Sequence, residues 1–246
     1  MKGKESRVEA TAVLETPRTV EQQRAAARSR SYQVFCAAFD YPEEPLCAAI
    51  RSGEVAQALR AALAEVDPLL TEDVDWSALA QVGEGDELAV EFTRLFDVGA
   101  SGPPCPLYGG LYFGARMKVM EEAVRFYNHF GLSLDESERE LPDHLQTELE
   151  FLHYLSYREA EMLIEGQDAG PYRRAQRDFV ARHPGRWVRL LCARLEQQQP
   201  QPYFLALARL LSRFLEHEQC SLLALAGPPP PEARGGVRAP ASIPVA

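Results

Sequence analysis

The 246-residue chain is poor in lysine and in paired cysteines, and each shortage excludes a class of protein. Only Lys2, Lys4 and Lys118 are lysines, and the formal net charge is -10. Because binding to nucleic-acid phosphates needs clustered basic residues, nucleic acid is excluded as a partner, and a cationic partner fits better. The five cysteines are odd in number and form no C-x-x-C pair, so the sequence indicates neither a disulfide framework nor a zinc site.

Long apolar runs are also missing. No uncharged apolar stretch approaches the roughly 20 residues that span a bilayer. The start of the chain, Met1-Lys2-Gly3-Lys4-Glu5, has no apolar core of the kind found in export signals. We therefore expect a cytoplasmic protein.

Helical periodicity extends over most of the chain, and no β-type alternation accompanies it. Thr19 and Gln22 have the spacing of a capping box at the first helix. The pattern predicts an all-α protein, a single irregular bundle of about eight to ten helices in one domain over residues 19–226. Residues 1–18 and the Pro/Gly-rich residues 227–246 are expected to be disordered.

Apolar stripes and Gly and Pro signals set the expected helix boundaries. The expected helices cover 19–39, 42–51, 55–66, 88–96, 117–130, 142–165, 171–182, 184–198 and 202–226. In the fifth of these, Met117, Met120, Val124 and Tyr127 form the expected inner stripe. The helix that begins near Pro142 is expected to be the longest.

The polar pair Asp143-His144 lies at the expected start of that helix. A carboxylate there can cap the free N–H groups of the first turn, so we expect capping to be the main structural task of Asp143. His144 is expected to be exposed, where an imidazole beside a carboxylate suits either proton transfer or the binding of a polar backbone.

Catalytic and metal-binding motifs are few. The sequence has no G-x-S-x-G and no Walker A loop, which leaves an Asp-His pair without a nucleophile or a nucleotide site. Glu150-x-x-His153 is its single E-x-x-H, whereas di-iron bundles use two, so His153 is expected to be a packed or rim residue. Cys105, between two prolines, is expected to be semi-buried and structural. No cofactor is predicted.

A run of carboxylates accompanies the Asp-His pair, consisting of Asp135, Glu136, Glu138, Glu140, Asp143 and Glu148. Charge runs are usually solvated faces. An acidic rim beside an apolar groove would nevertheless suit a peptide in which arginines precede hydrophobic residues. A twin-arginine export signal is such a peptide.

Three motifs resemble those of the TorD/DmsD family of redox-enzyme maturation chaperones. They are Glu91-Phe92-x-x-Leu95-Phe96, Phe126-Tyr127-x-x-Phe130-Gly131-Leu132 and Leu141-Pro142-Asp143-His144-Leu145-x-x-Glu148-Leu149-Glu150-Phe151-Leu152. The resemblance extends from about Tyr32 to Phe214. It implies an all-helical cytoplasmic protein that binds the twin-arginine signal of a molybdenum enzyme before cofactor insertion and export.

The resemblance also implies a site. In the family the Asp-His pair is implicated in recognition of the signal peptide, a role that maps onto Asp143 and His144, with Glu140 and Pro142 in the same motif. Glu148 and Phe96 complete the predicted site. Many members read Glu-Pro-x-Asp-His, so the order Leu141-Pro142 is a departure.

A second departure is Gly109-Gly110, where many members carry a polar pair. The Pro-Cys-Pro and Gly-Gly version resembles the branch that serves enzymes of the dimethyl-sulfoxide-reductase type.

We thus predict a non-enzymatic chaperone that binds the signal peptide and the apo form of a molybdenum oxidoreductase subunit, as a monomer or a domain-swapped dimer. Two alternatives stay open. One is a helical-bundle enzyme that uses Asp143, His144 and Glu148. The other is a generic helical adaptor, which would bind a folded partner and ignore an isolated signal peptide.

Overall fold

A computed structural model describes residues 17–83, 86–100, 102–133 and 141–229. The described residues form helices and no strand, which confirms the all-α prediction. The helices are α1 (Val20–Ala38), α2 (Glu44–Arg51), α3 (Glu54–Val66), α4 (Glu87–Phe92), α5 (Arg116–His129), α6 (Leu145–Ile164), α7 (Gly170–Arg182), α8 (Pro184–Gln198) and α9 (Pro202–Ala226). Short 3₁₀ turns occupy Pro68–Thr71, Ala78–Ala80 and Gly109–Tyr112. Most of the two termini expected to be disordered, residues 1–16 and 230–246, lies outside the described residues.

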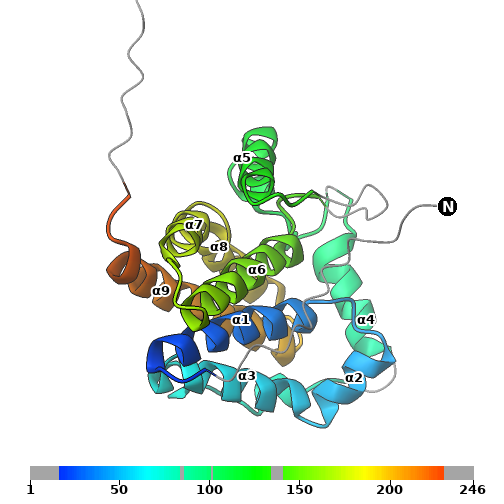
Figure 1. The fold of residues 1–246 in the computed structure, drawn as a ribbon. Coiled ribbons are helices and arrows are strands. Elements are labelled where there is room, and N and C mark those ends of the chain that lie inside the picture. The colour runs from blue at the N-terminus through cyan, green and yellow to red at the C-terminus, as the bar shows by residue number, and fades with distance from the viewer. Residues whose placement is uncertain (1–16, 84–85, 101, 134–140, 230–246) are drawn as a thin grey trace, which may run out of the picture.

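Helix α1 lies at the centre of the fold, between α3 and α6 (Figure 1). It begins with the predicted capping box, in which the Thr19 side chain accepts from the Gln22 N–H and the Gln22 side chain accepts from the Thr19 N–H. Tyr32 and Phe35, on its inner face, are fully buried and pack against Phe214 of α9. The first predicted helix is therefore confirmed at its start.

Helices α7, α8 and α9 form the C-terminal part of the bundle. Prolines at the starts of α8 and α9 lack a backbone N–H that the first turn would leave unpaired, so Pro184 and Pro202 mark both starts as predicted. The prediction that the helix near Pro142 is the longest was wrong, because α9 has 25 residues and α6 has 20.

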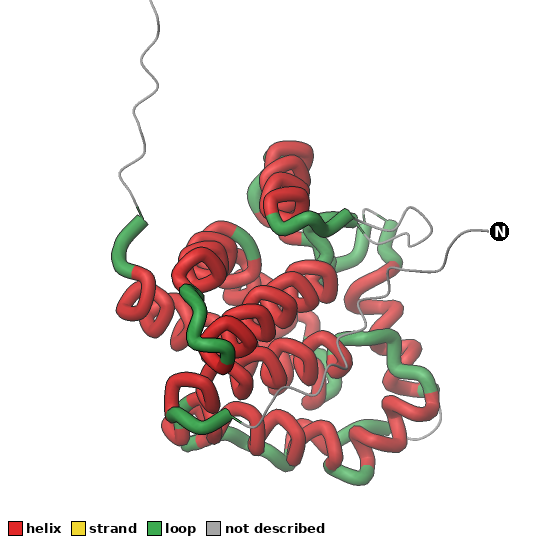
Figure 2. The backbone as a smooth tube through the Cα atoms, in the orientation of Figure 1, coloured by secondary structure: helices red, strands yellow, loops and turns green. Residues whose placement is uncertain are grey.

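Helix α5 stands apart from the α1–α3 layer, as the tube view also shows (Figure 2). Aromatic rings hold it to the bundle: Phe126 lies 5.2 Å from Phe179, and Tyr127 lies 4.9 Å from Phe151. The prediction that Met117 faces inward was wrong, because its side chain is 67% exposed. Only part of the expected stripe on this helix is needed to cover the rings beneath it.

A π-helical turn over Thr93–Asp97 extends α4 and replaces the regular helix expected over 88–96. The Val98 N–H donates to the Thr93 carbonyl at 3.0 Å, an i→i+5 bond. Phe92 and Phe96 remain in contact across this turn, with ring centroids 4.9 Å apart.

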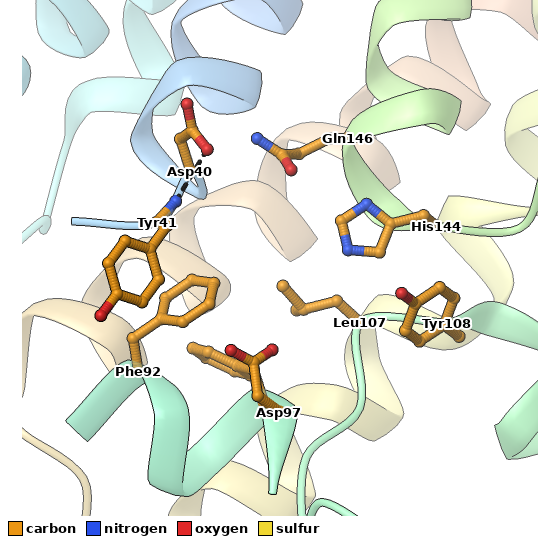
Figure 3. A pocket seen from close by; sticks show the side chains of 9 residues that line it. Asp40, Tyr41, Phe92, Asp97, Leu107, Tyr108, His144 and Gln146 are labelled. Atoms are coloured by element: carbon orange, nitrogen blue, oxygen red, sulfur yellow. Dashed lines mark hydrogen bonds between the residues drawn. The ribbon is translucent and has the colours of Figure 1, made fainter. Parts of the chain in front are cut away.

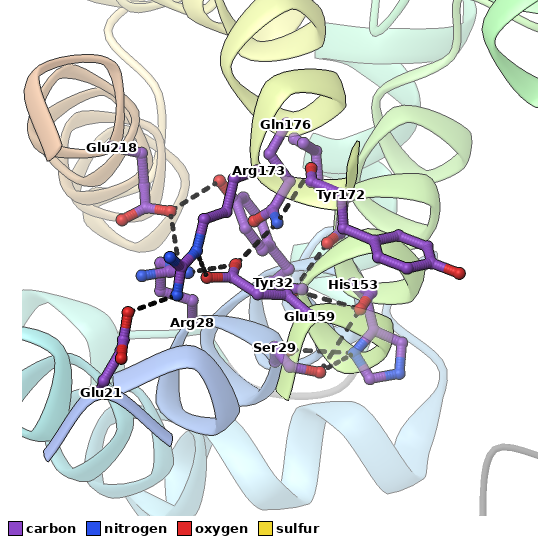
Figure 4. Close-up of polar contacts among 12 residues, drawn as sticks. Glu21, Arg28, Ser29, Tyr32, His153, Glu159, Tyr172, Arg173, Gln176 and Glu218 are labelled. Atoms are coloured by element: carbon purple, nitrogen blue, oxygen red, sulfur yellow. Dashed lines mark hydrogen bonds and ion pairs between the residues drawn. The ribbon is translucent and has the colours of Figure 1, made fainter. Parts of the chain in front are cut away.

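A buried ion network joins α1, α6, α7 and α9 (Figure 4). The Arg28 guanidinium contacts Glu159, and its Nε lies 3.5 Å from Glu218. Arg173 donates to the other oxygen of Glu159 at 2.8 Å, and Gln176 adds a further bond of 2.8 Å. Burial raises the pKa of Glu159, but the Arg28 charge and these donors outweigh it and leave that pKa below its ordinary value.

Candidate functional site

Asp143 does not cap α6. The helix begins at Leu145, its N-cap residue is His144, and no side chain caps it. Asp143 is fully buried, and its Oδ2 accepts from the Gly110 backbone N–H at 2.9 Å. The capping prediction was wrong because a backbone donor from a distant turn occupies the carboxylate.

His144 was expected to be exposed, and this too was wrong, because only 7% of it is exposed. Its ring lies 4.8 Å from the Tyr108 ring, and the two backbones form an antiparallel bridge. Burial lowers the pKa of His144 to about 4, although the Asp40 charge opposes this. The imidazole is therefore neutral at pH 7.

Glu148 is also buried rather than part of an exposed acidic rim. Its Oε2 accepts from the Trp187 indole N–H at 2.9 Å, and its Oε1 lies 3.6 Å from His183 Nδ1. Burial raises the pKa of Glu148, while His183 and Trp187 oppose the rise. Glu148 therefore fixes α6 to α8 from inside.

The other three predicted site residues are Pro142, Glu140 and Phe96, and they lie in different surroundings. Pro142 is half-buried, and its carbonyl accepts from the Tyr127 hydroxyl at 2.7 Å. Glu140 lies outside the described residues, as do Asp135, Glu136 and Glu138 of the carboxylate run. Phe96 lines a cleft that also contains His144. The structure thus brings two of the six predicted site residues to one surface.

This cleft has a volume of about 160 Å³ and lies between the ends of several elements. Figure 3 shows side chains from the end of α1, from α4 with its π turn, from the loop before Gly109 and from the start of α6 pointing toward a common space. The lining residues are Asp40, Tyr41, Phe92, Phe96, Asp97, Leu107, Tyr108, His144 and Gln146.

The apolar part of the cleft is an aromatic wall. Tyr41, 46% exposed, lies edge-on to Phe92 at 5.5 Å, and Phe96 is backed by Phe204 of α9 at 5.3 Å. Rings in this arrangement offer a firm apolar surface because each is held by its neighbour. Phe92 and Phe96 are themselves only 6% and 2% exposed, so Tyr41 supplies most of the accessible apolar surface of this wall.

The polar part of the cleft is acidic. Asp40 and Asp97 are both exposed and lie on opposite sides of the cleft in Figure 3. Partial burial raises the pKa of Asp97, and one oxygen of Asp40 accepts from the Tyr41 N–H at 2.8 Å. Among the described residues that line the cleft there is no lysine or arginine, so its charge favours a cationic ligand.

Sequence reasoning missed both of these carboxylates, together with Tyr41, Leu107 and Tyr108. They come from loops and helix ends, where periodicity carries no signal. The turn that closes α1 was visible in the sequence as Phe39-Asp40-Tyr41-Pro42, but nothing there indicated which other segment it would face.

The Gly109-Gly110 turn behind the cleft has a steric explanation. A Cβ at Gly109 would lie 2.7 Å from Trp187 Nε1, and one at Gly110 would lie 2.8 Å from Asp143 Oδ2. Any side chain here would push the turn away from α6 and α8. Glycine at both positions therefore allows the backbone to donate directly to Asp143.

Two minor candidates prove to be structural. Cys105, expected to be semi-buried, is fully buried, and burial raises the pKa of its thiol to about 11. His153 is half-buried, and its Nδ1 lies 2.9 Å from the Ser29 hydroxyl, so it packs α6 on α1 as predicted. Across the described ranges, no group of three or more His, Cys, Asp or Glu side chains is placed to hold a metal ion.

None of the described helices combines the length and the apolar character that crossing a membrane requires.

Comparison with known proteins places the chain among assembly factors. A family model described as "Nitrate reductase delta subunit" matches residues 52–193. The perchlorate reductase assembly chaperone protein of Dechloromonas aromatica is 29% identical over 199 residues, which cover 78% of this chain and 88% of that protein. The dimethyl sulfide dehydrogenase assembly chaperone protein of Rhodovulum sulfidophilum is 31% identical over 217 residues, covering 83% and 85%. The chaperone protein TorD of Vibrio parahaemolyticus is 29% identical over 140 residues, covering 56% and 65%.

Proposed function

Because this chain belongs to the TorD/DmsD family of redox-enzyme assembly chaperones, we propose that it binds the twin-arginine leader of an apo molybdenum oxidoreductase subunit in the cleft beside His144. The family consists of assembly chaperones, so the protein is not an enzyme. The relatives are named as assembly chaperones of perchlorate reductase and of dimethyl sulfide dehydrogenase, which supports a redox enzyme of this kind as its client.

One observation carries the proposal: two exposed carboxylates face an aromatic wall across a single cleft. A leader of this class joins arginines to an apolar run. Its guanidinium groups would donate to Asp40 and Asp97, and an apolar side chain would pack on the aromatic wall, mainly on Tyr41.

The other polar groups at the cleft suit a peptide backbone. His144 is neutral at pH 7, so it adds no positive charge to repel an arginine. The Gln146 side chain, whose amide N–H₂ donates to the Cys36 carbonyl at 3.4 Å, retains its own carbonyl for an incoming N–H.

Asp143, Pro142 and Glu148 act indirectly in this proposal. Asp143 holds the Gly110 turn, and the Gly109 N–H donates to the Asp143 carbonyl at 2.9 Å, so both bonds fix the segment that carries Tyr108. These residues position the cleft without touching its ligand.

The chaperone must also release its client. Binding that ends when the cofactor is inserted requires a higher affinity for the apo subunit than for the loaded one, because a ligand with equal affinity for both shifts no population. We include protection of the unfilled cofactor pocket and proofreading before export in the proposed function.

Calorimetry with synthetic leaders tests the site. The peptide copies the leader of a molybdenum oxidoreductase subunit from the same organism, which we call the client, and a second peptide has glutamine in place of both arginines. Asp40→Asn with Asp97→Asn should weaken binding of the first peptide about 5- to 10-fold, because two charge-assisted contacts are lost at a partly exposed site. The second peptide should bind the wild type and the double variant equally.

The matched control is Glu54→Gln with Glu216→Gln, which removes the same charge from exposed positions on α3 and α9. It should leave leader affinity unchanged. Equal binding of both peptides by the wild type would contradict the proposal. If the isolated leader fails to bind while the mature subunit binds, the adaptor alternative is favoured instead.

A further inference from the structure

Two arginines of α8 lie over the rings of the segment that follows the Gly-Gly turn. The Arg194 guanidinium is 4.2 Å from the Tyr112 ring centroid, and that of Arg186 is 4.0 Å from the Phe113 centroid. Contacts this close are favourable cation–π pairs. Stacking uses the flat face of a guanidinium and leaves its N–H edge available.

A third arginine repeats the arrangement over the residue that precedes the Gly-Gly turn. The Arg116 guanidinium lies 5.7 Å from the Tyr108 ring centroid. We call Arg116, Arg186 and Arg194, with the three rings beneath them, the arginine band. Each cation is therefore held in place by a ring rather than by an opposite charge.

The lack of opposite charge sets the band apart from the ten described arginines that form ion pairs with carboxylates. Those that pair with carboxylates are Arg28, Arg30, Arg51, Arg94, Arg125, Arg158, Arg173, Arg177, Arg182 and Arg209. No described carboxylate lies within ion-pair distance of any arginine in the band. Acidic residues outnumber basic ones by 36 to 26, so unpaired cations gathered over the rings of residues 108–113 form a local site for anions.

The backing of the band is rigid. The Tyr112 ring stacks on the buried Trp187 at 5.2 Å with an interplanar angle of 25°, and Trp187 is held by Glu148. A cation fixed on such a support loses little side-chain entropy when it binds a partner.

The spacing of the cations favours a protein surface over a compact anion. Arg186 and Arg194 are eight residues apart on α8, which is about 12 Å along the helix axis. Three guanidiniums on three different rings suit carboxylates distributed over a folded surface. A nucleic acid would be repelled by the net charge of -10.

The band adjoins the leader cleft. Tyr108 lines the cleft with His144 and also carries Arg116. We propose that the arginine band docks an acidic surface on the folded body of the client subunit, while the cleft holds its leader. This inference rests on the proposed function, and it assigns the chaperone a second contact that does not depend on the leader.

The test separates the two contacts. Arg186→Gln with Arg194→Gln is titrated with the apo client subunit expressed without its leader, and separately with the leader peptide. Affinity for the leaderless subunit should fall about 10-fold, and its dependence on salt should flatten, because charges at an interface rim act through screened attraction. Affinity for the leader peptide should remain that of the wild type.

Arg24→Gln with Arg30→Gln is the matched control, since it removes two exposed arginines from α1 and should change neither affinity. Arg186→Lys with Arg194→Lys keeps both charges and should retain the salt dependence of binding. This result would show that the glutamine variant loses affinity because it loses charge and not because it misfolds. Wild-type affinity of the glutamine variant for the leaderless subunit would overturn the inference. Failure of the leader peptide to bind the wild type would instead remove the proposed leader site and leave the band standing.

Discussion

Helix α6 carries two buried glutamates whose pKa values are shifted in opposite directions. Glu159 meets Arg28 and Arg173 in the ion network, whereas Glu148 meets an indole and an imidazole behind the cleft. Glu148 Oε1 and Asp143 Oδ1 have no hydrogen-bond partner among the described residues. The comparison shows that a buried glutamate joins helices in two ways here, through ion pairs with arginines at Glu159 and through an indole donor at Glu148.

Replacing Glu159 should have the largest effect. Glu159→Ala removes the closest partner of the buried Arg28, which Glu218 compensates only in part, and should lower the free energy of unfolding by about 3–5 kcal/mol. Urea denaturation measures this directly. Glu65→Gln, which breaks the exposed pair with Arg30, is the control and should cost less than about 1 kcal/mol. A similar loss in both variants would mean that the network adds little to stability.

As pH falls, protonation of His144 in the cleft should destabilise the folded protein at a higher pH than protonation of Glu159 in the ion network does. Its pKa is lowered from 6.5 to about 4 in the folded state, so the folded protein binds fewer protons than the unfolded chain between these values. Stability is therefore full above pH 6.5 and falls as pH drops toward 4, by about 3 kcal/mol from this residue. His144→Gln should lose that dependence.

Denaturation of the wild type and His144→Gln at pH 7 and pH 4.5 measures the difference. The lowered pKa of Glu159 costs stability only below its ordinary value of 4.5, so the network should not contribute in this window. Parallel pH profiles for the two proteins would show that His144 is not shielded in solution.

Trp187→Phe should give the smallest of the three effects. It removes the indole donor to Glu148 and should cost about 1–2 kcal/mol at pH 7, because a buried carboxylate then lacks a partner. Losing this donor raises the pKa of Glu148 further, so the carboxyl protonates sooner as pH falls and the cost shrinks. Trp76→Phe is the control, because Trp76 is half-buried and the Arg60 guanidinium lies over its ring. The loss of stability in this variant should not depend on pH in this way. A pH-independent cost for Trp187→Phe would remove Glu148 from the explanation.

The fold could be predicted from the sequence because its signals are local. The Thr19-Gln22 box and the prolines at 184 and 202 act within one helical turn, and the structure places helix starts beside them. Tertiary structure overrides such signals in places: Met117 of α5 is exposed, and Asp143 bonds to a distant turn instead of capping α6.

The site was harder to predict because its bonds are not local. Asp143 precedes a helix and has the residue type of a cap, but its partner Gly110 lies 33 residues earlier. The cleft is built from four segments, and of its lining residues only Phe92, Phe96 and His144 belonged to the motifs found in the sequence. The carboxylates that face outward, Asp40 and Asp97, have no spacing relation in the sequence.

The π turn at the end of α4 has a consequence for how such a surface can change. In a regular α-helix, residues five apart point about 140° away from each other around the axis. The wider turn brings Phe92 and Asp97 to the same cleft, an aromatic ring and a carboxylate side by side. Converting the π turn to a regular α-helix of the same length would turn Asp97 away from Phe92, so the conformation of this one turn decides whether the cleft carries that carboxylate.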